Sequence, residues 1–188
     1  MTRNPWDTRF TCGGSSGGAA VALAIGQVAL ATGTDMGGSL RIPGSFCGIV
    51  GFRPSPGRVA RGPTSTPLDR LSVHGPMARN VRDAALMLDA EVGTHALDPL
   101  SQPAPPEPFL AATDRLPAPA RVAWTPNLGI APVDPEVAAI AGRAAAWFAE
   151  TGAVIELGMY SISPCSSATV ASNARSSAAG GWPSFLPQ

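Results

Sequence analysis

"GTDMGGSLRIPGSFCG", Gly33 to Gly48, places two glycines directly before Ser39, and a basic residue and a proline shortly after it. Glycine adopts backbone angles that other residues avoid, and it lets main-chain N–H groups approach a ligand closely. Proline fixes φ and stiffens the backbone that follows it. The stretch therefore predicts a serine held in a fixed pose within a small cradle of backbone donors.

The composition is that of a globular chain with a sizeable core. Of its 188 residues, 45% are hydrophobic and 14% are charged. The 13 basic residues balance the 13 acidic ones, and every basic residue is an arginine, because the sequence contains no lysine. There is no basic run and no interleaving of basic and aromatic residues, so we expect no nucleic acid partner.

Membrane and compartment signals are also weak. The N-terminal residues 1–10 contain no apolar segment that would indicate a signal peptide. The longest apolar stretch, 19–33, is too short to span a bilayer and indicates buried core, so no membrane contact is expected. The three cysteines, Cys12, Cys47 and Cys165, show no pairing pattern, which is typical of reduced, buried thiols in a cytoplasmic protein.

Segments with helical and strand-like patterns alternate along the chain, which predicts the α/β class. Helix caps are expected at Asn80 and at Asp134, where a proline follows directly. The expected helices are 16–25, 80–92 and 134–152, the expected strands are 28–32, 49–52, 122–124 and 154–157, and 98–119 is expected to be a proline-rich linker or surface loop.

The last thirty residues differ from the rest. Residues 159–188 contain one charged side chain, Arg175, and eight serines, without a periodic pattern of apolar positions. Such a segment buries too little apolar surface to offset the entropy of ordering. We expect one domain at 1–158 and a disordered, low-complexity tail at 159–188. A second interpretation is that the reading frame or gene was disrupted near Gly158.

A second glycine–serine loop, "CGGSSGGAA" at 12–20, precedes the first one. A phosphate-binding loop would need a lysine after its last glycine, and there is none. A nucleophile elbow G-x-S-x-G is formally present with Ser16 at its centre, but an elbow needs a strand directly before it, and residues 2–11 show no strand pattern. The third interpretation is that the two serine loops act together.

The two histidines offer a different hydrolase arrangement. Ser16 and His95, with Asp69 or Asp83 between them, have the chain order of a serine hydrolase. His74 lies in the turn-like "SVHGP", and His95 follows the expected end of a helix at Gly93, so the alternative is that both are ordinary loop histidines. Neither has a second ligand at metal-site spacing, and we expect no metal and no cofactor.

Three blocks in this order, "GGSSGGAA", "ALATGTDMGGSLRIPGSFCGIVGFRP" and "GPMARNVRDAALMLDA", resemble the amidase signature family. The resemblance covers about Asn4 to Leu157, and Ser15 and Ser39 are separated by 24 residues, as are the family's two catalytic serines. It implies a hydrolase of carboxylic amides with a Ser–cis-Ser–Lys triad. It also implies a partial amidase-signature fold, a mixed sheet flanked by helices.

The same resemblance implies roles for single residues. Ser39 matches the nucleophile that is acylated, and Ser15 matches the bridging serine, which relays the proton and follows a cis peptide bond. The main chain of Met36, Gly37, Gly38 and Ser39 matches the oxyanion hole. Asp35 and Arg41 flank the nucleophile, and we expect them either to pair and support the loop or to be a plain solvated pair.

The departure from the family is the absent lysine. The family's base lies some tens of residues before the double serine, whereas only fourteen residues precede Ser15 here. We therefore expect the middle part of an amidase, a fragment impaired in hydrolysing its small-molecule amide substrate. The alternatives are a fragment of the A-type component of a glutamine-dependent tRNA amidotransferase and a non-catalytic remnant or assembly partner. The sequence decides neither the substrate nor the oligomeric state.

Overall fold

The computed structural model of the chain describes residues 2–115, 121–129 and 131–158. The chain divides into two compact units, Met1–Leu116 and Pro117–Gln188. This division falls inside the span 1–158, which the sequence suggested as one domain. The expected tail at 159–188 lies outside the described residues.

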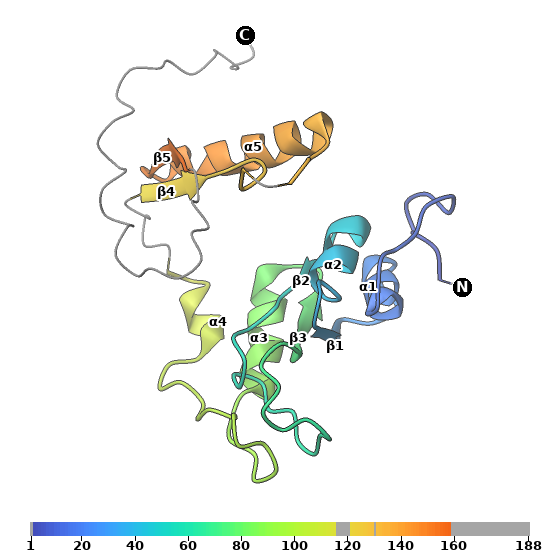
Figure 1. The fold of residues 1–188 in the computed structure, drawn as a ribbon, viewed down its shortest axis with the longest axis vertical. Helices are drawn as coiled ribbons and strands as arrows, with labels where there is room; N and C mark the ends of the chain where they lie inside the picture. The colour runs from blue at the N-terminus through green and yellow to red at the C-terminus, as the bar shows by residue number, and fades with distance from the viewer. Residues whose placement is uncertain (1, 116–120, 130, 159–188) are drawn as a thin grey trace. The chain divides into compact units, whose positions relative to one another are not determined.

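The first unit is built on a three-stranded antiparallel sheet (Figure 1). The strand order is β1 (Leu30–Asp35), β3 (Val73–Ala78) and β2 (Val50–Gly51). The register places Asp35 opposite Val73, so β1 ends where β3 begins. Gly51 is needed in β2 because a Cβ atom at this position would lie 2.1 Å from the Leu40 carbonyl oxygen.

Helices lie on both sides of this sheet. Figure 1 shows α3 (Val81–Glu91) on one side of the strands, and α1 (Gly17–Ala24) and α2 (Arg41–Cys47) on the other. The cap expected at Asn80 is present, because its side chain accepts a hydrogen bond from the Asp83 N–H.

The buried core of the first unit lies next to the segment that carries Ser39. Leu23 of α1, Cys47 of α2 and Met77 of β3 are fully buried and belong to one cluster. Leu40, the residue directly after Ser39, is also fully buried in this cluster. The packing of Leu40 thus fixes the backbone directly after Ser39 to the core.

Strand β3 corrects a prediction from the sequence. The segment "SVHGP" was expected to form a turn, yet His74 lies within the central strand. Proline is normally confined to edge strands, so Pro76 is an unusual residue in a central strand. Five of the six residues of β3 are buried, so no alternation of polar and apolar residues marks the strand in the sequence. The Pro76 carbonyl accepts a hydrogen bond from the Phe52 N–H at 3.1 Å.

The proline-rich segment also contains a short helix, α4 (Phe109–Ala112), where a linker or loop was expected. The Asp89 carboxylate of α3 accepts hydrogen bonds from the N–H groups of Phe109 and Leu110, at 2.7 and 2.9 Å. These amides begin the helix and have no partner within it. A contact with a side chain about 20 residues away thus stabilises this helical turn.

The second unit contains the strand–helix–strand pattern that the sequence predicts. β4 (Arg121–Trp124) and β5 (Val154–Leu157) pair in parallel, and α5 (Pro135–Glu150) connects them. Asp134 caps α5 by accepting a hydrogen bond from the Glu136 N–H. The α/β class is confirmed. Within the part of the chain that the structure describes, no helix is long and apolar enough to cross a bilayer.

Candidate active site

The segment that carries Ser39 folds around a buried carboxylate. We call residues 36–40 the Ser39 loop. Asp35, at the end of β1, has no exposed surface, and its two carboxylate oxygens accept hydrogen bonds from the N–H groups of Gly38 (2.7 Å) and Leu40 (3.2 Å). Gly38 has a φ of 114°, a backbone conformation that favours glycine. The bonds to Asp35 thus hold the amides on both sides of Ser39.

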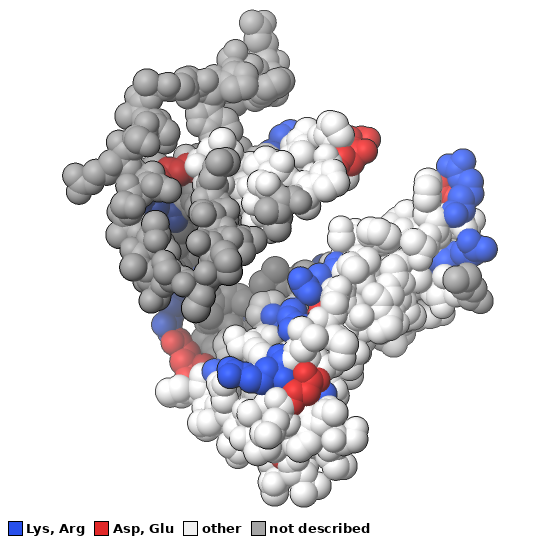
Figure 2. Space-filling view, viewed as in Figure 1, with Lys and Arg blue, Asp and Glu red and all other residues white. Residues whose placement is uncertain are grey.

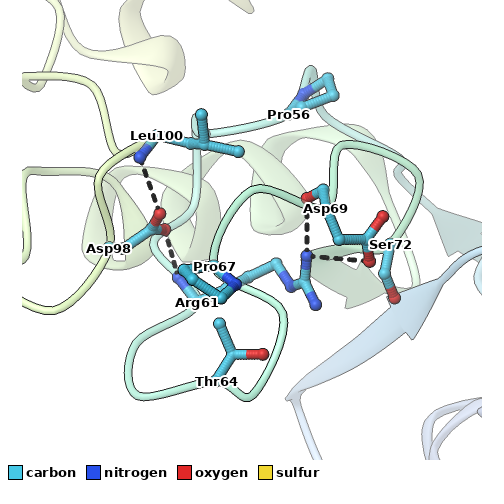
Figure 3. A pocket seen from close by; sticks show the side chains of 9 residues that line it. Pro56, Arg61, Thr64, Pro67, Asp69, Ser72, Asp98 and Leu100 are labelled. Atoms are coloured by element: carbon cyan, nitrogen blue, oxygen red, sulfur yellow. Dashed lines mark hydrogen bonds and ion pairs between the residues drawn. The ribbon is translucent and has the colours of Figure 1, made fainter.

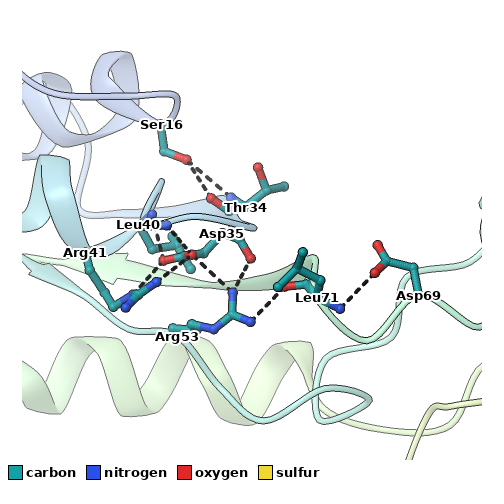
Figure 4. A network of polar contacts seen from close by, with 9 residues as sticks. Ser16, Thr34, Asp35, Leu40, Arg41, Arg53, Asp69 and Leu71 are labelled. Atoms are coloured by element: carbon teal, nitrogen blue, oxygen red, sulfur yellow. Dashed lines mark hydrogen bonds and ion pairs between the residues drawn. The ribbon is translucent and has the colours of Figure 1, made fainter. Parts of the chain in front are cut away.

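Two arginines neutralise this carboxylate (Figure 4). Arg41 binds it with two atoms, Nε at 2.9 Å and Nη2 at 3.0 Å, and Arg53 Nη1 lies 3.1 Å from Oδ1. The Arg41 hydrogen bonds hold the pKa of Asp35 far below its usual range, and the Gly38 and Leu40 amides act in the same direction against the effect of burial. Asp35 is therefore a permanent anion that binds the loop and does not exchange protons at neutral pH.

The main chain joins the Ser39 loop to the double-serine loop, residues 12–16. The Ser16 N–H donates to the Ser39 carbonyl at 3.3 Å. The Ser16 hydroxyl accepts from the Thr34 N–H at 3.2 Å and donates to the Thr34 carbonyl at 3.4 Å, so it ties the start of α1 to β1 (Figure 4). The peptide bond between Gly14 and Ser15 is cis. Two segments about 24 residues apart in the sequence thus lie side by side.

The two hydroxyl groups assigned from the resemblance are accessible. Ser15 is exposed and Ser39 is half-buried. Among the described residues neither hydroxyl has a hydrogen-bond partner, and no direct bond joins them. Their catalytic roles therefore stay predictions.

The backbone donors of the Ser39 loop are of two kinds. The Gly38 N–H is engaged by Asp35. The N–H groups of Met36, Gly37 and Ser39 have no acceptor within the described part of the chain. Of the four N–H groups that the resemblance assigns to an oxyanion hole, three are thus without an acceptor in the described residues, and that of Gly38 is bound to Asp35.

The alternative arrangement of Ser16, an aspartate and His95 is not assembled. The Ser16 hydroxyl is bound to Thr34, and His95 Nδ1 accepts from the Leu97 N–H at 3.2 Å. Asp69 accepts from the Leu71 N–H, and Asp83 pairs with the Asn80 cap. No strand precedes Ser16, since only an isolated bridge joins Arg3 and Thr11 in that segment. These side chains perform separate local tasks.

His74 lies on β3 opposite Thr34, in the neighbourhood of the serine loops. Burial lowers the pKa of its imidazole, and the charge of Arg61 lowers it further. His74 is therefore neutral at neutral pH.

A small pocket lined by both charged and apolar residues lies between the loops that follow β2 and α3 (Figure 3). Asp98 accepts hydrogen bonds from the N–H groups of Arg61 (2.7 Å) and Leu100 (2.9 Å). The Arg61 guanidinium binds Asp69 through Nη1, and its buried Nε has no partner among the residues described. No residue of the two serine loops lines this pocket, so it is separate from the candidate active site.

Sequence reasoning missed Arg53. Its contacts to Asp35 and to Leu71 each span 18 residues, and no local pattern marks an arginine for such a role. Leu40 was also missed as the core anchor of the Ser39 loop, although a leucine directly after the nucleophile is visible in the sequence.

Comparison with known proteins gives the family. The family model described as Amidase matches residues 1–180. The chain belongs to the amidase signature family.

Its relatives include enzymes named for different activities. An acylamidase of Rhodococcus erythropolis is 44% identical over 154 residues, which are 82% of this chain and 32% of that protein. The A component of the glutamyl-tRNA(Gln) amidotransferase of Moorella thermoacetica is 43% identical over 155 residues, with the same coverage. The crystal structure of a bacterial aryl acylamidase aligns with a TM-score of 0.77 at 39% identity, covering 84% of this chain and 32% of that one. The chain thus spans about a third of the length of the relatives it matches.

Proposed function

We propose that the chain carries the nucleophile and oxyanion part of an amidase site. The observation that carries this proposal is the backbone contact between Ser16 and Ser39, which places the double-serine loop beside the Asp35-bound Ser39 loop. Acyl transfer needs a hydroxyl nucleophile and fixed donors that face the developing oxyanion. In this proposal, the three unengaged N–H groups of the Ser39 loop serve as these donors.

In this proposal, Ser39 Oγ attacks the carbonyl carbon of a carboxylic amide. The negative charge on the carbonyl oxygen is stabilised by the N–H groups of the loop. The Ser39 proton passes through the Ser15 hydroxyl, which both accepts and donates a proton, to a base. The base returns the proton to the leaving amine as the C–N bond breaks, and water then hydrolyses the acyl-Ser39 ester.

The base that the family resemblance implies for this scheme is missing from the 188 residues. They contain no lysine, and arginine stays protonated at any working pH, so it cannot accept the proton. We therefore propose that these residues alone leave the site incomplete, and that an added amine can take the place of the missing side chain.

Chemical rescue tests this proposal. The purified chain is assayed on an anilide substrate with increasing concentrations of a small primary amine. We expect a rate that follows the free-base form of the amine, is absent in Ser39→Ala and is strongly reduced in Ser15→Ala. Ser45→Ala, an exposed serine of α2, is the matched control and should behave as the unaltered chain does. An amine-dependent rate that is equal in Ser39→Ala, or no such rate at all, would contradict the proposal.

A second candidate is the release of ammonia from glutamine, as part of the A-type component of an amidotransferase. It is favoured by the Moorella thermoacetica relative, whose 43% identity nearly equals that of the acylamidase. The same rescue assay, run with glutamine and coupled to ammonia detection, separates the two candidates. Ser39-dependent rescue with glutamine and not with the anilide would favour the amidotransferase, whereas the opposite result favours the amidase.

A further inference from the structure

Arg53 contacts the end of β1 and the segment that precedes β3, at the point where the Ser39 loop begins (Figure 4). It lies two residues after β2 ends at Gly51. Its Nη1 group donates to both the main-chain carbonyl and the carboxylate of Asp35, and its Nη2 group donates to the Leu71 carbonyl at 2.7 Å. One guanidinium thus connects the last residue of β1 with the segment that leads into β3.

Arg41 does not duplicate this contact. Arg41 belongs to α2 and follows the loop directly, and its side chain is 56% exposed. The Arg53 side chain is only 22% exposed. Arg41 makes the hydrogen bonds that lower the pKa of Asp35, whereas Arg53 is the partner that is better shielded from water. Arg53 also binds the Asp35 backbone, which Arg41 does not, so it fixes the position of the residue as well as its charge.

We infer that Arg53 is a positioning residue for the Ser39 loop. By holding the Asp35 carbonyl and carboxylate together, it keeps the Gly38 and Leu40 N–H groups bound, and the loop keeps one conformation. The guanidinium is suited to this task because its donors form a planar fork that reaches several acceptors at once. A lysine offers a single ammonium and cannot reach both Asp35 and Leu71 with the same geometry. The consequence for catalysis rests on the proposed function, but the effect on the loop does not.

Amide hydrogen exchange tests the effect on the loop directly, because it measures local opening residue by residue. In Arg53→Met we expect exchange at Gly38 and Leu40 to be at least about tenfold faster, the factor that corresponds to ~1.4 kcal/mol. Exchange at Met77, in the core, should change far less. Arg53→Lys should give an intermediate effect at the same two amides.

Arg58→Met is the matched control, since Arg58 is also a half-buried arginine that donates to a backbone carbonyl, that of Pro103 at 3.2 Å. It should leave Gly38 and Leu40 unchanged. If Arg53→Met leaves both amides unchanged, or accelerates Met77 by the same factor, Arg53 does not position the loop. Arg53→Lys retains the charge, so it serves the same comparison where the methionine variant fails to fold.

A kinetic readout connects the loop with chemistry. In the amine-rescued assay, Arg53→Met should lower kcat about tenfold or more, the factor that corresponds to ~1.4 kcal/mol, with KM and the pH profile unchanged. An unchanged kcat beside accelerated exchange would overturn the consequence for catalysis, although Arg53 would still hold the conformation of the loop. Failure of the unaltered chain to show any rescue would contradict the proposed function. The exchange experiment would still test whether Arg53 positions the Ser39 loop.

Discussion

Asp35 is the residue on which the Ser39 loop depends most. Its buried carboxylate is surrounded by two guanidinium groups and two backbone amides, and an asparagine here would remove the charge and replace one acceptor oxygen by an NH2 donor. We expect Asp35→Asn to lower the free energy of unfolding by about 3 kcal/mol, the cost of leaving buried partners unpaired. Urea unfolding of the unaltered chain and of Asp35→Asn measures this difference in free energy. Asp114→Asn, which breaks the exposed pair with Arg82, should change stability by less than about 1 kcal/mol.

The same residue gives a pH dependence of defined sign. The folded pKa of Asp35 is depressed, so its contribution to stability is complete above the unfolded value of about 3.9 and is lost as the pH falls below it. The difference in unfolding free energy between the unaltered chain and Asp35→Asn should therefore be constant from about pH 5 to 8, and should shrink only below about pH 4. A difference that shrinks near neutral pH would mean that Asp35 is not the permanent anion described above.

The pKa of Glu91, at the end of α3, is shifted in the opposite direction to that of Asp35. Its buried Oε2 atom has no hydrogen-bond partner among the described residues, and burial raises the pKa of the carboxyl, with a hydrogen bond to Thr32 offsetting part of the rise. The folded protein therefore disfavours the charged form, and the cost is largest above the raised pKa. We expect Glu91→Met to increase the free energy of unfolding by about 1 kcal/mol at neutral pH.

That gain should diminish as the pH falls toward the ordinary glutamate value of about 4.3, because the carboxyl is then protonated in the folded chain as well. Thermal unfolding of both proteins across this range checks the trend. A methionine variant that is less stable at neutral pH would indicate that the carboxylate is satisfied.

At the scale of elements, local signals predicted the structure well and long-range contacts did not. Asn80 and Asp134 mark helix starts because a cap is an interaction over two or three residues. Strand β3 was missed because its place in the centre of the sheet is set by β1 and β2, strands that are distant in the sequence. The serine loops were predicted from their glycines, whereas Arg53 was not, since its partners are also distant.

The cap at Asn80 gives a prediction for α3. Asn80→Ala removes the acceptor of the Asp83 N–H and should lower the free energy of unfolding by about 1 kcal/mol. Asn80→Ser keeps a side-chain acceptor and a donor and places no second negative charge beside Asp83, so it should be close to neutral. Urea unfolding followed by circular dichroism distinguishes them, and equal losses in both variants would show that the cap contributes nothing.

At the scale of the whole molecule, the chain spans about a third of its relatives and exposes many apolar side chains. Figure 2 shows a mostly uncharged face, on which charged side chains lie at several separate places. Trp6, Phe10 and Phe46 line an open groove beside α2, and Trp6 donates its indole N–H to the Cys47 carbonyl at 2.8 Å. The 188 residues also contain no lysine, the base that the proposed function requires.

Hydrolysis of simple amides by the purified chain, without an added amine, is the decisive measurement for an incomplete site. The chain and Ser39→Ala are assayed side by side on a panel of aliphatic and aryl amides. We expect equal and very low rates, because losing a member of a catalytic triad costs about 10⁴ to 10⁶ in turnover. Turnover above about 1 s⁻¹, within the ordinary range of enzymes, that disappears in Ser39→Ala would contradict this expectation. Such a result would mean that another group, such as His74 or a second chain, supplies the base.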